Sequence, residues 1–433
     1  MAIELEKNLM IGMLTVLGKL VNRNATAPER KALRIEAQEG VLTFRVHSAI
    51  DRLAYRLETP TPETFIAHVD FDAFRDAVRT CRSRMMEFGF TGSALNVGGT
   101  SVPLAEVNWP ASEVHSKGLS CTLPEKVIDM FAYAAQVVNP SDIRQALHGI
   151  NLNRIGITAT NSKEMVHIPC SLMLESVTIP VPVALIQSKC EEGGRFSFWL
   201  QDKKTWFCMT IGPWEWTAPA LSESFPNWRS VVPKEDSLRH RFTLTHEVSE
   251  ELQTALRGLN DPNDELAVTL SKSDSGKLEV QAGGLRLQLE AEFEGPWAKA
   301  VLGVNRKILL HILSHGHTSI AFGDTCHAPF IATGGVGRFI AMSLNLSFIP
   351  KTTKEDPVYT KEVNVGEPGT VPVASPLDEL SESIENFRAK LKSLFEESAV
   401  LLRKVREAAL QQKQKEREFV QARKAIERIR MAI

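Results

Sequence analysis

The segment LPEKVIDMFAYAAQVV, residues 123–138, decides the fold because the chain carries two further segments of the same kind. These are LMIGMLTVLGKLVNR, residues 9–23, and LTHEVSEELQTALRGL, residues 244–259. One begins 114 residues before residue 123 and the other 121 residues after it. Each segment places apolar residues at helical spacing. Recurrence at a nearly constant distance indicates an internal repeat.

A second helical segment follows each of the three, at residues 69–81, 179–190 and 304–316. Strand-like runs come after these second helices, at residues 85–107, 195–216 and 318–344. The order helix, strands, helix, strands therefore occurs three times. We predict an α+β protein with much antiparallel sheet, built from three homologous domains at about 1–120, 121–236 and 237–350.

The chain changes character after these domains. Residues 351–376 are rich in Pro, Gly, Val and Thr without a period, which is typical of a linker. Residues 377–433 repeat apolar residues at spacings of three and four, interrupted at Ser398, Gln412 and Lys415. This heptad pattern predicts a coiled-coil helix or a helical hairpin. Its apolar seam needs a second chain, its own folded-back half or another protein. The acidic first half and basic second half favour an antiparallel arrangement.

The composition is that of a globular protein, with 43% hydrophobic and 24% charged residues among 433. No run reaches the roughly 18 uncharged apolar residues of a membrane helix. The N-terminus carries Glu4 and Glu6 where a signal peptide is basic. The six cysteines are scattered and form no CxxC pair: Cys81, Cys121, Cys170, Cys190, Cys208 and Cys326. We expect a cytoplasmic protein with reduced thiols and no zinc site.

The formal net charge of −2 hides an uneven distribution. Residues 403–430 hold ten Lys or Arg and four Glu, which leaves −8 for the rest of the chain. Within this acidic body, Arg75, Arg79 and Arg82 recur at helical spacing on a face separate from the apolar stripe of their helix. Such a row indicates contacts with phosphates or, alternatively, a solvated face.

No catalytic constellation stands out in the chain. Gly98-Gly99 and Gly334-Gly335-x-Gly337 lack the Lys-Ser/Thr of a phosphate-binding loop and fit turns between strands. His311, His315 and His317 suggest a metal cluster, but no carboxylate or Cys lies close by in sequence, so a solvated or core-edge face fits better.

Three tryptophans, Trp206, Trp214 and Trp216, offer a possible platform for stacking bases. Alternation in a strand points the last two to one side, which favours a core or inter-domain contact. We find no acid–base pair or metal-ligand cluster in the sequence of the kind that a hydrolase or nuclease needs. We therefore expect no enzymatic activity and no cofactor.

Several motifs make the repeats resemble the β sliding clamp family, the β subunits of bacterial DNA polymerase III. Residues 225–234, FPNWRSVVPK, are similar to the family's Phe-Pro-Asp-Tyr-x-x-Val-x-Pro segment. Residues 123–161 follow the family's run of helix, strand and strand. Residues 339–346, FIAMSLNL, resemble the Met-Pro-Met-Arg-Leu ending of many clamps. The resemblance covers about residues 1–350, and the heptad tail is not part of the usual clamp.

The resemblance implies a DNA sliding clamp, a processivity factor that tethers DNA polymerase and other partners to duplex DNA. Two copies meet head to tail as a ring, with helices lining the hole and antiparallel sheets forming the outer wall. The alternative is a divergent clamp paralogue of a mobile element or repair system, which acts as a DNA-bound scaffold through its coiled-coil tail.

A ring that slides holds DNA through phosphates, independently of base sequence. The candidate lining residues are Lys19, Arg23, Arg75, Arg79, Arg82, Arg144, Lys189, Arg306 and Lys307. Edge strands of the first and third domains are expected to pair between the two copies of a homodimer, with one edge near Val102 and Leu104 and a facing helix that carries Leu256 and Leu259. These four are the candidate contact residues.

Partners of this family, such as the polymerase and the clamp loader, insert a short peptide between the second and third domains. The matching positions here are Thr160, Met165, Pro226, Val231, Ile340 and Met342. The rim departs from the family. Residues 161–164, NSKE, replace Asp-Gly-His-Arg, Ser230 replaces a common basic residue, and Ser343 replaces Pro. Val181-Pro182 also lacks the basic residue common at that helix start. We expect a retained pocket floor with an altered rim.

Overall fold

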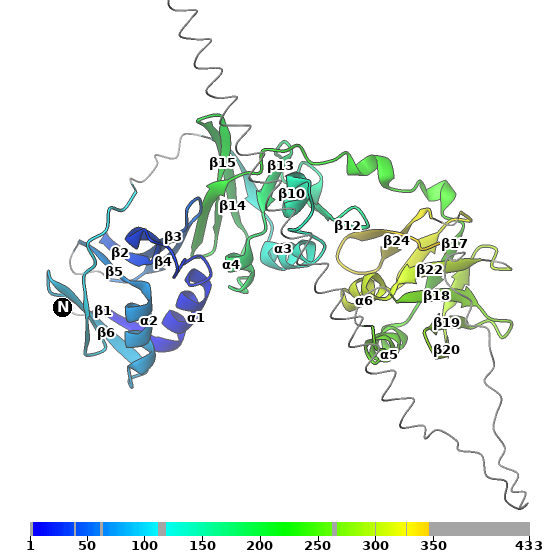
Figure 1. Ribbon diagram of the computed structural model, residues 1–433, viewed down its shortest axis with the longest axis horizontal. Coiled ribbons are helices and arrows are strands. Elements are labelled where there is room, and N and C mark those ends of the chain that lie inside the picture. The colour runs from blue at the N-terminus through cyan, green and yellow to red at the C-terminus, as the bar shows by residue number, and fades with distance from the viewer. Residues whose placement is uncertain are drawn as a thin grey trace, which may run out of the picture. The chain divides into compact units, whose positions relative to one another are not determined.

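The chain folds as three consecutive repeats in which the elements follow one order: a strand, a helix, a run of strands, a second helix and three strands (Figure 1). The computed structural model describes residues 3–38, 40–60, 64–110, 118–261, 266–298, 300–325 and 327–345. The predicted linker 351–376 and heptad segment 377–433 lie outside these residues. Their interpretation therefore stays a prediction, as do the domain boundaries.

Each repeat is defined by its own set of elements. The first contains β1 (Ile3–Glu6), α1 (Lys7–Leu17), β2 (Ala32–Gln38), β3 (Val41–His47), β4 (Arg52–Glu58), β5 (Phe65–Asp70), α2 (Phe71–Thr80), β6 (Met85–Phe90), β7 (Ala94–Val97) and β8 (Thr100–Pro103). The second contains β9 (Leu119–Leu123), α3 (Val127–Ala135), β10 (Gly149–Asn153), β11 (Gly156–Thr160), β12 (Glu164–Pro169), β13 (Val177–Pro180), α4 (Val183–Ile186), β14 (Gly194–Gln201), β15 (Lys204–Ile211) and β16 (Trp214–Pro219).

The third repeat keeps this order and adds one short strand, β21. It contains β17 (His240–Thr243), α5 (His246–Arg257), β18 (Ala267–Lys272), β19 (Leu278–Ala282), β20 (Leu285–Leu289), β21 (Glu292–Glu294), β22 (Val301–Asn305), α6 (Arg306–Ser314), β23 (Ser319–Phe322), β24 (Pro329–Thr333) and β25 (Arg338–Met342). The predicted α+β class with antiparallel sheets is confirmed, since every strand pair within the sheets is antiparallel.

Two long sheets run from one repeat into the next. The eight-stranded sheet has the order β5-β2-β3-β4-β16-β15-β14-β9, so it crosses from the first repeat to the second between β4 and β16. The nine-stranded sheet has the order β13-β10-β11-β12-β25-β24-β23-β17-β21 and crosses between β12 and β25. Two four-stranded sheets, β1-β6-β7-β8 and β20-β19-β18-β22, complete the first and third repeats. Strands β8 and β20 are edges of these sheets.

Side-chain caps mark the starts of α2, α5 and α6, whereas α1, α3 and α4 have none. Asp70 accepts a hydrogen bond from the Ala73 backbone N–H at the start of α2, and Thr245 accepts one from Val248 at the start of α5. Helix α4 is much shorter than residues 179–190 predict. Pro180 ends strand β13 and Pro182 precedes the helix, while Lys189 has a left-handed backbone with φ of 50° that prevents continuation.

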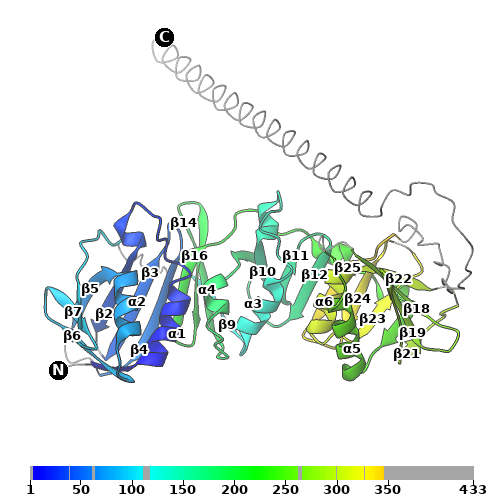
Figure 2. The ribbon, with the colours of Figure 1, turned by 60° about the horizontal axis from the view of Figure 1, so that its bottom comes forward.

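The two helices of each repeat pack together against its sheets (Figure 2). Helix α2 buries Phe74, whose ring lies 5.6 Å from that of Phe88 in β6 and 6.3 Å from that of Phe44 in β3. Phe44 and Phe88 belong to different sheets, so these rings fill the space between the two sheets and the helix. Neighbouring repeats also touch through helices, since α1 contacts α4.

The tryptophan pair belongs to the core. Trp214 and Trp216 are 5% and 4% exposed, and their rings pack against Tyr55 and Phe207 at centroid distances of 4.8 and 4.9 Å. They are therefore not available to stack on bases, as the alternation in sequence suggested. Among the described residues, none of the helices is long and apolar enough to cross a membrane.

Candidate functional site

An apolar pocket opens where the second repeat meets the third. The six residues that the sequence pointed to lie together in its wall and come from three separate stretches of the chain, residues 160–165, 226–231 and 340–342. The cavity has a volume of about 220 Å³ and is lined by Arg144, Leu147, Thr160, Ser162, Lys163, Glu164, Met165, Pro226, Asn227, Trp228, Val231, Pro329, Ile340, Ala341 and Met342. A concave site with mostly apolar walls suits aliphatic or aromatic groups.

The pocket floor is the pair of strands β12 and β25. Met165 lies opposite Ile340 in the antiparallel register, and both pack with Ile331 in a small buried cluster. The segment after β16 covers one side and contributes Val231. The side chains of Val231 and Met342 remain 55% and 41% exposed. Such exposed apolar side chains beside a hollow mark a surface that a partner can cover.

Trp228 forms an aromatic wall that the list of matching positions did not include. Its ring lies 4.6 Å from that of His167 in β12, and the guanidinium of Arg229 lies 5.5 Å from it on the ring face. Burial lowers the pKa of His167 to about 4, with smaller contributions from Arg338 and Arg229. The imidazole is therefore neutral near pH 7. The FPNW segment, where the family has Tyr, was the available signal for this wall.

The rim of the pocket is polar and basic. Arg144 forms an ion pair with Asp142 at 3.1 Å and donates a hydrogen bond to the Ser162 hydroxyl. The hydrogen bonds from Arg144 lower the pKa of Asp142, so the pair stays charged. These contacts hold the guanidinium of Arg144 beside the pocket, while its side chain stays 59% exposed, so its predicted contact with DNA stays a prediction. Lys163 is exposed and has no ion-pair partner in the part of the chain that the structure describes.

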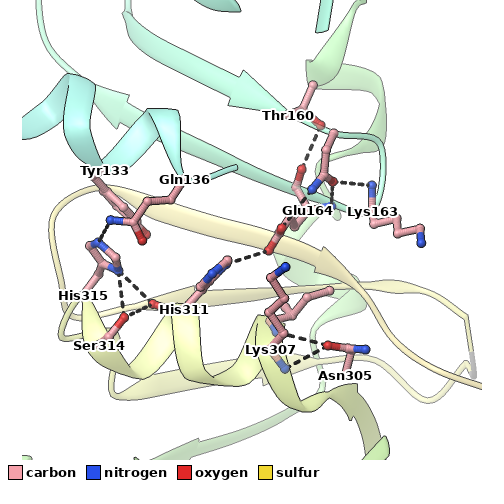
Figure 3. Close-up of polar contacts among 12 residues, drawn as sticks. Tyr133, Gln136, Thr160, Lys163, Glu164, Asn305, Lys307, His311, Ser314 and His315 are labelled. Carbon is pink, nitrogen blue, oxygen red and sulfur yellow. Dashed lines mark hydrogen bonds and ion pairs between the residues drawn. The ribbon is translucent and has the colours of Figure 1, made fainter. Parts of the chain in front are cut away.

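Behind the pocket, polar side chains fasten the second repeat to the third (Figure 3). The buried carboxylate of Glu164 in β12 faces His311 of α6, with 3.5 Å between oxygen and nitrogen. The Tyr133 hydroxyl of α3 lies 2.6 Å from Nε2 of His317, and its ring stacks on His315 with centroids 3.9 Å apart. Burial lowers the pKa of His317 to about 4.

The three histidines of the sequence pattern thus contact the neighbouring repeat. In the described part of the chain, no three His, Cys, Asp or Glu side chains group as metal ligands. The core-edge interpretation of the motif agrees with this geometry. These contacts hold together the two strands that form the pocket floor, since Glu164 is itself paired with Ala341 of β25.

The basic residues predicted to face DNA have several environments. Arg79 and Arg82 are exposed at the end of α2, and Lys19, Lys189 and Lys307 are exposed at or beyond the ends of α1, α4 and α6. The charge of Arg75 is opposed by Asp72 at 2.8 Å, and Asp72 also pairs with Arg23 at 3.0 Å. Arg79 and Arg82 therefore carry the least compensated charge of the α2 row.

Arg306 binds groups of its own repeat, and the prediction that it contacts DNA is wrong. Its side chain is 11% exposed and forms an ion pair with Asp261 at 3.1 Å. It also donates to the backbone carbonyls of Leu256 and Leu259. The guanidinium thus binds carbonyls at and just beyond the C-terminal end of α5.

The candidate contacts between copies are also corrected in part. Val102 and Leu256 are 2% and 0% exposed, because they point into their own repeats, so neither reaches a partner. Leu104 and Leu259 are half-buried. Among the described strands, β8 and β20 each form one end of a four-stranded sheet.

Comparison with known proteins places this arrangement among solved folds. No family model matches the chain, and no curated protein matches it in sequence. A sliding clamp from Bacillus subtilis superposes with a TM-score of 0.66 at 14% identity, covering 80% of this chain and 99% of that one. A Helicobacter pylori β clamp bound to a DNA ligase peptide gives 0.65 at 16%, and a Bartonella birtlesii clamp bound to griselimycin gives 0.66 at 16%. Both cover 80% of this chain and 100% of theirs. The chain has the sliding-clamp fold.

Proposed function

We propose that this protein is a DNA sliding clamp: a non-enzymatic ring of two copies that encircles duplex DNA and holds partner proteins through short peptides. The fold supports this proposal, since the solved structures that share it are clamps. The observation that carries it is the pattern of strand edges that have no partner strand among the described residues.

Each repeat has two sheets, and each sheet ends on a strand that can continue into a neighbour. Strands β4, β12 and β20 occupy equivalent places in the three repeats, and so do β8, β16 and β25. Within the chain β4 pairs with β16 and β12 pairs with β25. Two strands remain without such a partner in the described part of the chain. They are β20, the counterpart of β4 and β12, and β8, the counterpart of β16 and β25. Exposed edges invite strand pairing. A second copy satisfies both edges by β20–β8 contacts at two places, and six repeats then close as a ring.

The exposed basic side chains provide the contact with DNA. Arg79 and Arg82 in the first repeat, Lys189 in the second and Lys307 in the third offer charges that neutralise phosphates without reading bases. The closed ring, rather than the affinity of these contacts, keeps the protein on the duplex.

The pocket between β12 and β25 provides the contact with partners. Two solved structures with this fold are described as bound to a DNA ligase peptide and to griselimycin. The apolar floor and exposed Val231 and Met342 of this chain suit the same kind of occupant, a short peptide with aliphatic or aromatic side chains. DNA polymerase and clamp loader subunits are the expected owners of such peptides.

The mass of the full chain in solution tests the ring. We expect a species of about 96 kDa at micromolar concentration, twice the 48.1 kDa of one chain. A mass of one chain at that concentration contradicts a ring that closes without other proteins.

A further inference from the structure

A second hollow adjoins the apolar pocket. It has a volume of about 570 Å³ and lies between residues 230–239 and the hairpin that joins β23 to β24. Val231, Pro329 and Met342 line both hollows. The two are therefore parts of one groove, and these three apolar side chains form its middle. The sequence patterns gave no indication of the second part.

The two ends of the groove carry opposite charge. Arg144 and Lys163 stand at the end formed by the second repeat, where Asp142 offsets one of the two positive charges. The carboxylate of Glu164 also lines this end, but it is buried and faces His311 at 3.5 Å. Asp236 and Asp324 stand at the other end, where Arg239 offsets only one negative charge through its 2.9 Å contact with Asp324. His240 adds a 2.6 Å hydrogen bond to Asp324, which lowers the pKa of that carboxyl and keeps it ionised.

Asp236 is the less compensated carboxylate of the acidic end. It is exposed in a short helical turn, residues 235–237, and has no ion-pair partner in the described part of the chain. Lys163 at the basic end is likewise exposed and has no ion-pair partner among the described residues. Each end thus presents one charge that a bound partner can pair with, and the apolar middle lies between them.

From this groove we infer a specificity that goes beyond a general apolar peptide: it takes an extended segment with an apolar centre, an acidic residue on one flank and a basic residue on the other. The basic flank lies over Asp236 and Asp324, and the acidic flank lies over Lys163 and Arg144. The inference rests on the proposed function, since it assigns the partner chemistry of the same pocket. Complementary ends also give the segment a direction, because the reversed segment brings like charges together.

Four synthetic peptides test this inference on the full chain. All have the same centre of two leucines and one phenylalanine, and their flanks are Glu before and Lys after, the reverse, Glu on both sides, or Lys on both sides. Fluorescence anisotropy at low salt measures their affinities. We expect one of the two mixed peptides to bind about tenfold more tightly than the other, as two exposed ion pairs allow. The difference shrinks in 0.5 M salt because these charges are screened.

Two variants in adjacent positions assign the acidic end. Asp236→Lys removes the preference for a basic flank, whereas Glu235→Lys, exposed in the same turn but outside the groove wall, keeps it. Asp236→Asn gives an intermediate loss, which separates charge from any local rearrangement. Equal loss in the Lys variants at 235 and 236 shows a long-range charge effect and overturns the inference.

The outcomes separate this inference from the proposed function. If the four peptides bind equally well and Met342→Ala weakens them all, the charged flanks have no role and the inference is wrong, while peptide capture stands. If no peptide binds at millimolar concentration, peptide capture itself fails, and the inference fails with it. A tenfold preference for one mixed peptide that Asp236→Lys abolishes supports both.

Discussion

The two junctions between repeats share the same antiparallel strand pairing but differ in the side chains that lie beside it. At the first, β4 pairs with β16, and Tyr55 lies opposite Trp214 with both side chains buried. At the second, β12 pairs with β25, and Met165 lies opposite Ile340 beside an open cavity. The comparison shows that strand pairing fixes how the repeats join, whereas the side chains decide how much space remains. The first junction is the more solid one, with a cavity of about 130 Å³ lined by Lys19, Val183 and Trp216, and the second is hollow, with about 220 Å³.

The polar contacts of the junctions differ as well. The first has an ion pair between Arg56 and Glu215 at 2.6 Å on an exposed sheet face. The second buries Glu164 against His311, and Tyr133 against His317. Exposed pairs contribute little to stability, while buried polar groups are costly once a partner is lost. The second junction is therefore the one that holds a ligand. Its buried histidines also give it a pH response opposite in sign to that of Asp51 beside the first junction, where burial raises the carboxyl pKa to about 6.

The largest expected effect is a loss of stability at the first junction, the more solid of the two. Trp214→Ala removes a buried indole that packs on Tyr55, so we expect the free energy of unfolding to fall by about 3–5 kcal/mol. Chemical denaturation followed by circular dichroism measures the loss. Trp228→Ala is the matched control at the hollow junction, where the side chain is only half-buried and we expect a clearly smaller loss. Equal losses in the two variants contradict the contrast between the junctions.

The next effect concerns binding at the hollow junction. Met342→Ala removes an exposed apolar wall, so we expect peptide affinity to fall by about 1.5–3 kcal/mol with little change in stability. Calorimetric titration with the tightest of the four peptides measures it. Leu200→Ala, also exposed but on β14 and outside the pocket wall, is the control and leaves affinity unchanged. Unchanged affinity in Met342→Ala shows that the pocket is not the peptide site.

A smaller effect distinguishes the junctions by pH. His167 and His317 belong to the second junction, and burial lowers the pKa of each to about 4, below the usual 6.5. Below pH 6.5 the unfolded chain takes up these protons and the folded chain does not, so the contribution of the two histidines to stability falls as the pH drops from 7 to 5. Asp51, whose pKa burial raises to about 6, contributes in the opposite direction over this range. We expect His317 to contribute about 1–2 kcal/mol to this loss.

Two variants isolate that contribution. In His317→Gln, urea unfolding at pH 7 and pH 5 should show a smaller difference than in the unaltered chain. In His246→Gln, which changes a 79% exposed side chain, the difference should stay the same. If both variants keep the full pH dependence, His317 titrates normally and the junction is not the pH-sensitive region.

The smallest effect compares the repeats as DNA surfaces. Replacing both Arg79 and Arg82 by Gln removes two phosphate contacts, so the slope of log affinity against log salt should fall by about 2. Binding to duplexes of unrelated sequence should weaken equally. Arg195→Gln, on strand β14, is the control. An unchanged slope in the double variant removes α2 from the DNA surface.

The element order was predictable from sequence because it repeats. Three similar helical segments at nearly equal distances leave few other interpretations, and the structure has the same order in all three repeats. The pocket residues were also found, since each lies in a short segment that resembles the clamp family. Helix α4 was predicted too long because a helical apolar pattern hid the effect of Pro180 and Pro182.

The remaining features depend on contacts between distant parts of the chain. Arg306 looked like a surface cation until Asp261, 45 residues earlier, neutralised it. Val102 and Leu256 are apolar residues near edges, and only the fold shows that they point inward. The charged ends of the groove come from segments far apart in sequence, so no local pattern brings Lys163 and Asp236 together.

The central claim is that two copies close around DNA through β8 and β20, and one cross-linking measurement tests it directly. Ser101→Cys and Gln288→Cys place one thiol on each exposed edge. The full chain carrying both substitutions is incubated with relaxed circular plasmid, so that rings can open and close around the DNA. It is then treated with a short bismaleimide. We predict a two-copy product that stays on the plasmid in hot detergent and is released when the plasmid is cut once. Cross-linked pairs that leave the uncut plasmid in detergent contradict a ring that encircles DNA.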